Sequence, residues 1–249
     1  MGQLKDLSIV ITGASSGIGE SIARRFWEEG AKLTLGSRHE PHNAGAGARW
    51  IPTDVSDPQA AQSLIDAAVD EHGRLDVLVN NAGVQIEKSI AETTDADFEL
   101  VMGVNVRGVF NCSRAAVRQM QAQSGGSIIN IGSIAGNNAD HGMAVYNASK
   151  GAVHALTRAI ATDHGRDGIR CNSIAPGWIA TALADAAFDL ADDPQAARDA
   201  AISKHPVGRL GLPEDIANLA VWLAGSESTF ASGSVFTVDG GLTAQSPIG

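Results

Sequence analysis

The sequence predicts an α/β fold in which strands and helices alternate around a parallel sheet, and three observations carry this prediction. Short apolar runs alternate with segments whose apolar residues repeat at helical spacing. A glycine-rich turn follows the first of these runs, and residues 75–79 form a run that is apolar except for Asp76, as in strands buried on both faces. With 249 residues, 44% of them apolar, the chain can bury one full core. We therefore expect a single doubly wound domain over residues 1–249.

The composition excludes several classes of function. The net charge is −10, and the few basic residues are scattered, whereas nucleic-acid binding needs clustered Lys and Arg. No apolar run approaches the roughly 20 residues of a membrane-spanning helix, and the first residues lack the features of a signal peptide. The histidines show no metal-ligand spacing, and Cys112 and Cys171 suit reduced core thiols. We expect a cytoplasmic protein with a small-molecule substrate and no metal, nucleic-acid or membrane partner.

The first strand is expected over residues 8–12 and the first helix over residues 18–29. Between them the turn TGASSGIG carries Gly13, Gly17 and Gly19. Glycines there allow a tight turn and a close approach to a pyrophosphate, whose charge the following helix N-terminus favours. An ordinary strand-to-helix turn is the alternative, but the position directly after the first strand favours dinucleotide binding.

The second strand, residues 32–36, ends where dinucleotide folds often carry an acidic residue that selects NAD. Ser37 and Arg38 occupy that place, and a hydroxyl beside a guanidinium suits a 2′-phosphate, so we expect NADP. A surface arginine without a ligand is the alternative. Residues 39–49 are rich in Gly, Ala and His without helical periodicity, so the second crossover is expected to be a loop or a very short turn.

A third strand is expected over residues 49–53, followed by Asp54, which would accept a hydrogen bond from the adenine amino group or simply cap a turn. The next helix is expected over residues 58–72. Its first position is a proline, and Ser56 or Asp57 would cap it.

The fourth strand, residues 75–79, leads into the sequence NNAG at residues 80–83. Ligands bind at the carboxyl ends of strands in open α/β sheets. Asn80 and Asn81 are therefore expected to hold the cofactor and the loop backbone together, and closing a turn is compatible with that role.

Residues 95–120 show a helical pattern that breaks near Asn105, an amide among apolar neighbours. A buried amide needs hydrogen-bond partners. Either Asn105 bonds to local backbone at a helix irregularity, or it displaces a helical bond and holds a water that links Lys150 to solvent.

The next strand, residues 127–133, delivers Ser133 at its end, and a long amphipathic helix follows over residues 146–165. Tyr146 and Lys150 lie one helical turn apart on it, so the cation would lower the phenol's pKa from its usual value of about 10. Ser133 would then hold a substrate oxygen beside the phenol. A capping serine, a core tyrosine and an exposed lysine are the plainer alternative.

The remaining segments continue the alternation. We expect a strand over residues 169–176, a helix over residues 212–225 and a last strand over residues 234–241. Residues 182–206 are rich in Ala and Asp and belong to an expected substrate lid at about residues 178–206. Candidates for substrate contact, each of which also suits plain packing, are His141, Gln85, Trp178 and residues 183–188.

Several motifs occur together in one order: TGASSGIG, Asp54-Val55, NNAG, Asn105, Ser133, YNASK at residues 146–150 and PG at residues 176–177. In this combination the chain resembles the short-chain dehydrogenase/reductase (SDR) family of Rossmann-fold enzymes. The resemblance covers nearly the whole chain and implies a seven-stranded parallel sheet with helices on both faces. It also implies a homotetramer.

The resemblance further implies a catalytic tetrad of Asn105, Ser133, Tyr146 and Lys150. Tyr146 would be the general acid or base, Ser133 would polarise the substrate oxygen, and Lys150 would bind the nicotinamide ribose. Asn105 would anchor a proton-relay water. The expected cofactor contacts are Gly13, Ser15, Ser16, Gly17, Ile18, Gly19, Ser37, Arg38, Asp54, Val55, Asn81, Ala82, Gly83, Tyr146, Lys150, Pro176, Gly177, Ile179 and Thr181.

The leading functional prediction is an NADP(H)-dependent oxidoreductase, such as a carbonyl reductase, that interconverts a secondary alcohol and a ketone. Because the linker over residues 37–49 is shorter than is usual in the family, an NAD-dependent sugar, polyol or cis-diol dehydrogenase is the alternative. A dinucleotide-sensing regulator without turnover is the alternative from another class.

Overall fold

A parallel sheet forms the centre of the molecule, and its elements are described by a computed structural model over residues 2–42 and 45–245. In these described ranges seven strands pair in parallel in the order β3-β2-β1-β4-β5-β6-β7. The strands are β1 (Ser8–Thr12), β2 (Lys32–Ser37), β3 (Arg49–Pro52), β4 (Val77–Asn80), β5 (Gly126–Ile131), β6 (Ile169–Pro176) and β7 (Val235–Val238).

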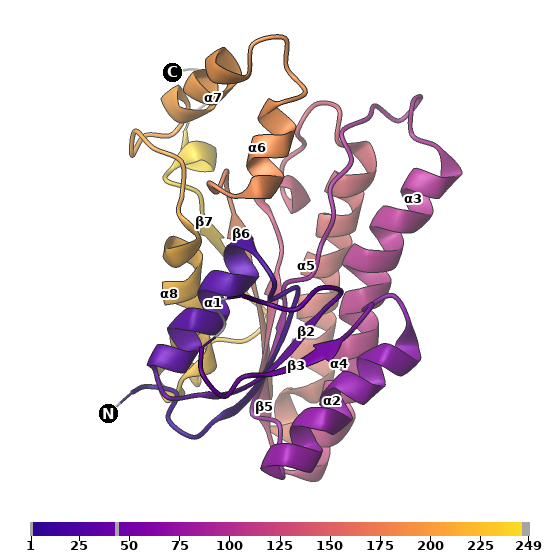
Figure 1. The fold of residues 1–249 in the computed structure, drawn as a ribbon, viewed down its shortest axis with the longest axis vertical. Helices are drawn as coiled ribbons and strands as arrows, with labels where there is room; N and C mark the ends of the chain where they lie inside the picture. Colours follow the sequence, from indigo (N-terminus) through magenta and orange to yellow (C-terminus); the bar gives the residue numbers. More distant parts are fainter. Residues whose placement is uncertain (1, 43–44, 246–249) are drawn as a thin grey trace.

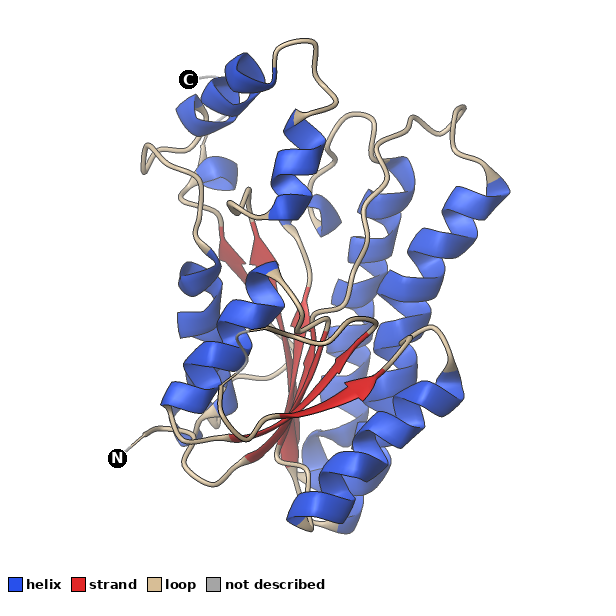
Figure 2. Ribbon diagram, viewed as in Figure 1, coloured by secondary structure: helices blue, strands red, loops and turns tan. Residues whose placement is uncertain are grey.

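Helices cover both faces of this sheet (Figures 1 and 2). The longer helices are α1 (Gly17–Glu28), α2 (Pro58–His72), α3 (Asp95–Met102), α4 (Gly108–Ala122), α5 (Ala144–His164), α6 (Ala182–Phe188), α7 (Pro194–Ser203) and α8 (Pro213–Ala224). Short 3₁₀ helices occupy Ile134–Gly136, Gly165–Asp167, Ser226–Ser228 and Leu242–Ala244.

The core has two apolar layers, one on each side of the sheet. On one side α1 and α8 pack with Ile9, Ile11 and Val79, and on the other side α2 and α4 pack with Val10 and Leu78. Alternate residues of β1 thus enter opposite layers, which is why its central residues 9–11 are all apolar and every residue of the strand is buried. The doubly wound α/β fold expected from the sequence is confirmed.

Most predicted elements lie where the sequence placed them. Helix α2 spans the predicted residues 58–72, and Asp57 caps it by accepting from the Gln59 N–H at 2.8 Å. Strand β4 begins at Val77 instead of residue 75, and the carboxylate of the preceding Asp76 accepts from the Ser8 N–H at 2.8 Å at the start of β1.

The second crossover contains no helix in its described residues 38–42 and 45–48, as predicted, while residues 43–44 of that loop lie outside the described ranges. The loop instead lies against α1. Trp27 Nε1 donates to the Ala46 carbonyl at 3.0 Å, and a Cβ on Gly45 would lie 2.3 Å from the Trp27 ring.

The predicted break in the long helix is a π-helical segment, Gly103–Arg107, between α3 and α4. There the Gly108 N–H bonds to the Gly103 carbonyl, which inserts an extra residue into the helical turn. Asn105 lies inside this segment and is 1% exposed.

The strand order reverses direction between β1 and β4, and this switch point places a crevice at the carboxyl edge of the sheet. Helices α6 and α7 lie beyond the carboxyl ends of β6 and β7 (Figure 1). In the described part of the chain no helix has both the length and the apolar character needed to cross a membrane.

Candidate active site

A cleft of about 860 Å³ opens at this carboxyl edge. Its walls come from the glycine turn, the ends of β2, β3, β4 and β5, the start of α5 and the segment after β6. Except for Gly19 and Asn105, every predicted catalytic and cofactor residue lines it. Residues far apart in sequence therefore meet in one site, as the motif order predicted.

The glycine turn is shaped for close approach. Gly13 and Gly17 have φ values of 65° and 58°, which side chains disfavour. A Cβ on Gly19 would lie 2.3 Å from the Gly13 carbonyl oxygen, so Gly19 permits packing of α1 on the turn without itself lining the cleft. Ser16, the N-cap of α1, makes no side-chain capping bond, and it lines the cleft with Ile18. The N-terminal N–H groups of α1 are thus left for an anion.

Asn81 joins the glycine turn to the end of β4. Its amide donates to the carbonyls of Thr12 and Gly13 at 3.1 and 2.9 Å, and the Thr12 hydroxyl accepts from the Asn81 N–H at 3.0 Å. Asn80 is buried and donates to Ser113 and Asn130, so it braces the sheet interior. The predicted backbone-holding role thus falls to Asn81.

The far end of the cleft holds the residues predicted to choose between cofactors. Ser37 is buried, and its hydroxyl already donates to the His39 carbonyl at 2.6 Å. Arg38 is exposed along the cleft wall. Asp54 accepts from the N–H and hydroxyl of Ser56 at 2.9 and 2.7 Å, and these bonds, with the nearby Arg38 charge, lower the pKa of Asp54. Asp54 therefore both closes a turn and lines the cleft.

Asn105 stands behind the cleft wall. Its side chain accepts from the Val84 N–H at 2.8 Å and donates to the Val84 carbonyl at 2.9 Å and to Ser149 Oγ at 3.0 Å. Asn105 lies at the predicted helix irregularity, but its backbone partner is Val84 in the loop after β4 and not the local backbone of the helix, and its role in holding a water stays a prediction. Asn105 Oδ1 and Lys150 Nζ lie 3.4 and 3.6 Å from a Cβ placed on Gly83, so both polar atoms surround that glycine.

Ser133, Tyr146 and Lys150 converge as expected. Ser133 lies after β5 and not within it, because the strand ends at Ile131. The Ser133 hydroxyl accepts from the Ala135 N–H at 3.1 Å and is also hydrogen-bonded to Tyr146. Lys150 is buried, and its Nζ donates to the Ile131 carbonyl at 2.9 Å and lies 5.6 Å from the centre of the Tyr146 ring. Of the plainer alternative, the exposed lysine is wrong, whereas the capping serine is confirmed, because Ser133 caps the 3₁₀ helix Ile134–Gly136.

Burial dominates the proton affinities of these groups. It raises the pKa of Tyr146 to about 12, the Ser133 hydrogen bond opposes this rise, and the Asp140 carboxylate adds to it. Burial also lowers the pKa of Lys150 to about 8. The expected lowering of the phenol's pKa by Lys150 is not found, because desolvation of the phenol outweighs the favourable contacts.

The segment after β6 forms the opposite wall. A Cβ on Gly177 would lie 2.8 Å from Asp239 Cβ, so only glycine suits this turn. Gly211 pairs with the backbone of Trp178 and Ala180, which leaves the Ile179 N–H out of that pairing. Thr181 caps α6 through the Ala184 N–H at 3.4 Å, and this bond competes with its predicted ligand contact.

Comparison with known proteins decides the family. A family model described as enoyl-(acyl carrier protein) reductase matches residues 13–243. Meso-2,3-butanediol dehydrogenase of Serratia marcescens is 38% identical over 243 residues, which cover 95% of this chain and 94% of that protein. The chain belongs to the short-chain dehydrogenase/reductase family.

Further SDR relatives agree in length and fold. The NADP-dependent (R)-specific alcohol dehydrogenase of Lentilactobacillus kefiri is 37% identical over 254 residues, covering 98% of this chain and 99% of that one. The ligand-free aldohexose dehydrogenase of Thermoplasma acidophilum is 34% identical with a TM-score of 0.94, over 100% of this chain and 98% of that structure. This SDR protein is an oxidoreductase that acts on CH–OH or C=O groups and uses NAD(P).

The substrate side of this SDR cleft is only partly as predicted. Gln85, Trp178 and Leu183 line it, whereas His141 is exposed and lies outside the lining. Trp178 also stacks on Phe188, with ring centres 5.0 Å apart. Among the lining residues that the sequence did not predict, three lie between Ser133 and Tyr146, and that position was the available signal: Ile134, Asp140 and Met143.

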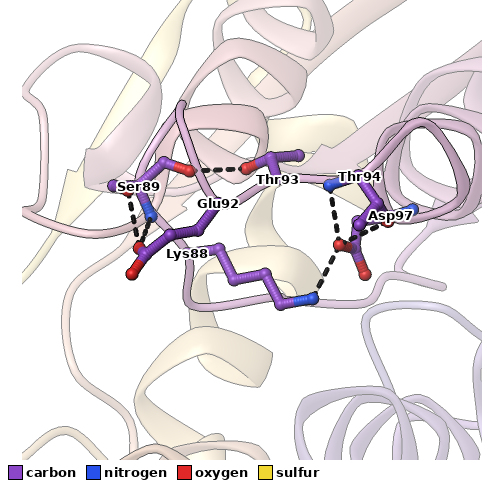
Figure 3. A network of polar contacts seen from close by, with 6 residues as sticks. All are labelled: Lys88, Ser89, Glu92, Thr93, Thr94 and Asp97. Carbon is purple, nitrogen blue, oxygen red and sulfur yellow. Dashed lines mark hydrogen bonds and ion pairs between the residues drawn. The ribbon is translucent and has the colours of Figure 1, made fainter.

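A polar network holds the loop between β4 and α3 (Figure 3). The Lys88 ammonium donates to Asp97 at 2.7 Å, and Asp97 also accepts from Thr94, so Lys88 first and Thr94 second lower the pKa of Asp97 to about 2. The Lys88 carbonyl accepts from the Ala144 N–H at 3.4 Å. The network thus ties this wall of the cleft to the helix that carries Tyr146. The adjoining turn is formed by Ser89, Glu92 and Thr93.

Proposed function

We propose that this protein is an NADP(H)-dependent oxidoreductase that interconverts a secondary alcohol and a ketone, with Tyr146 as the general acid or base. The observation that carries the proposal is the meeting of Ser133, Tyr146 and Lys150 in the same cleft as the glycine turn. A non-catalytic sensor of dinucleotides has no need for a phenol, a hydroxyl and an ammonium at one point of the cleft.

The residues present fit a bound dinucleotide. The glycine turn and the uncapped start of α1 suit the pyrophosphate, and Arg38 suits a 2′-phosphate at the adenosine end. At the other end, Lys150 would hold the nicotinamide ribose, while Pro176, Gly177, Ile179 and Thr181 would hold the carboxamide side. When bound, the nicotinamide supplies the hydride, or accepts it in the reverse direction.

The protein's own residues would manage the proton. In reduction, Tyr146 Oη gives its proton to the carbonyl oxygen, so the ketone gains a hydride and a proton and becomes the alcohol. Ser133 Oγ hydrogen-bonds the same oxygen where negative charge develops. With its pKa raised to about 12, the Tyr146 phenol of the free protein is protonated at neutral pH and can donate its proton in reduction. Asn105 and Lys150 would lead a replacement proton in from solvent.

A second candidate is an NAD-dependent sugar, polyol or cis-diol dehydrogenase. It is favoured by Ser37, whose hydroxyl already donates to the His39 carbonyl and therefore leaves Arg38 as the main ligand for a 2′-phosphate. The butanediol and aldohexose dehydrogenases among the relatives also suit it.

We further propose that residues 178–206 form a lid over the substrate and that the protein is a cytoplasmic homotetramer. The small apolar cluster in which Ala184 and Phe188 of α6 are packed by Ala197, Ala201 and Ile202 of α7 supports a lid in which the two helices move together. Half-exposed Phe98 and Phe110 supply apolar surface for subunit contact. Light scattering in solution tests the tetramer, and a monomer would contradict it.

The test of function is a panel of ketones assayed with NADPH and NADH by following the absorbance of the reduced nicotinamide. Wild-type protein should turn over ketones faster with NADPH. Arg38→Gln should lower kcat/KM for NADPH about tenfold, the effect of one charge-assisted hydrogen bond, with little change for NADH. Arg118→Gln, an exposed arginine outside the cleft, is the control. Equal rates with both cofactors would contradict the NADP assignment, and tight binding without turnover would favour the sensor.

A further inference from the structure

The carboxylate of Asp140 lies at the Tyr146 end of the cleft and has no hydrogen-bond donor from the described residues. Asp140 lines the same cleft as Ser133 and Tyr146, is half-buried, and lies near enough to Tyr146 for its charge to act on the phenol. Within the described residues no donor is hydrogen-bonded to its side chain. Its backbone carbonyl accepts from Asn147 Nδ2 at 3.0 Å, which fixes the residue against α5.

The surroundings of this carboxylate are otherwise mostly apolar. The cleft lining near the lid and the start of α5 includes Ile134, Met143, Trp178, Leu183 and Ala186. Burial raises the pKa of Asp140, and the Lys204 charge only partly opposes this. The Asp140 carboxylate is only half-buried, and a covered acceptor without a donor costs free energy, so a ligand that covers it must supply the donor.

We propose that Asp140 is the specificity-determining residue of this cleft and accepts a hydrogen bond from a hydroxyl on the carbon next to the reacting carbon. The preferred substrates are then α-hydroxy ketones and the matching vicinal diols, with an apolar group on the other side. The inference rests on the proposed function, because it takes Tyr146 to mark the reacting oxygen.

Two features favour a neutral hydroxyl over an ammonium as the donor. Lys150 already lines this cleft, and the charge of Lys204 acts on Asp140 from outside the lining. A substrate cation would add to them, whereas a hydroxyl leaves the balance of charge unchanged. The position near Tyr146 favours a hydroxyl close to the reacting carbon over one at the far end of a long substrate.

The test compares two ketones that differ by one hydroxyl: 2-hydroxy-1-phenylethanone, which carries the hydroxyl on the carbon next to the carbonyl, and acetophenone. In the wild type, kcat/KM should be about 10- to 100-fold higher for the hydroxy ketone, as expected for a hydrogen bond to a charged acceptor. Asp140→Asn should reduce this ratio several-fold, and Asp140→Leu should abolish or reverse it. Asp189→Asn, which removes an exposed lid carboxylate outside the cleft, should leave the ratio unchanged.

A ratio near one in the wild type, or an equal loss for both ketones in the Asp140 variants, would overturn the assignment. An equal shift, for both ketones, of the pH profile of kcat/KM in the Asp140 variants would also overturn it. Asp140 would then act only through the charge that it places near Tyr146.

Binding of both ketones to the cofactor-loaded protein, measured by calorimetry in Tyr146→Phe, separates this inference from the proposed function. Preferential binding of the hydroxy ketone without turnover by the wild type would support the Asp140 assignment and contradict the proposed reaction. Turnover of both ketones with equal kcat/KM would do the reverse.

Discussion

The buried ammonium of Lys150 is expected to destabilise the free protein at neutral pH. Its side chain is buried, and burial lowers the pKa of Lys150 from 10.5 to about 8. In the unfolded chain the pKa returns to its ordinary value. At about 1.4 kcal/mol per pH unit, folding with a charged Lys150 costs about 3 kcal/mol at pH 7.

The change Lys150→Met removes this cost but leaves the Ile131 carbonyl without its donor, a loss of about 1–2 kcal/mol. The variant should therefore be more stable than the wild type by about 1–2 kcal/mol at pH 7. Between pH 8 and 10.5 the unfolded chain still binds the proton that the folded wild type has lost, so wild-type stability rises with pH. The advantage of the variant should shrink by about 2 kcal/mol between pH 7 and 9.5.

Urea unfolding of the cofactor-free protein at both pH values measures this change. The difference between variant and wild type cancels the other titrating groups. Lys5→Met removes an exposed lysine, so its difference from the wild type should stay nearly constant with pH. A Lys150→Met protein that is less stable at pH 7, or whose advantage does not change with pH, would refute the reasoning.

Two further predictions concern the packing of glycines near the cleft and the protonation of a buried histidine. Gly19→Ala places a Cβ 2.3 Å from the Gly13 carbonyl oxygen, so it should destabilise the fold by about 1–3 kcal/mol and weaken NADPH binding in calorimetry. Gly151→Ala in α5, where the added Cβ has an ordinary contact, should be neutral or stabilising. Burial lowers the pKa of His154 from 6.5 to about 4, so the folded state resists the proton that the unfolded chain takes up. Stability should fall by about 2 kcal/mol from pH 7 to 4.5 in urea unfolding, and a His154→Gln variant that falls as steeply would contradict this.

Local patterns were enough to predict most of the fold. The apolar runs and the proline and aspartate at the start of α2 act within a few residues, so the helix and strand positions could be read from them. Asn105 was also readable, because a single amide among apolar residues signals an irregular helix. The motif order located the cleft, since the carboxyl ends of parallel strands share one edge.

Contacts between distant segments could not be read in the same way. The place of Asp140 depends on its bond to Asn147 and on the pairing of Lys88 with Met143, which no local period encodes. The raised pKa of Tyr146 has the same origin, because the spacing to Lys150 reveals a nearby cation but not how much water the fold removes.

Replacement of Tyr146 by Phe tests the central claim most directly. The phenol's ring should still fill its place, so NADPH affinity measured by calorimetry should stay within a few-fold of the wild type. Ketone reduction should fall by about 100-fold or more, because general acid catalysis contributes that much. A Tyr146→Phe protein that binds NADPH and reduces ketones at the wild-type rate would contradict the account.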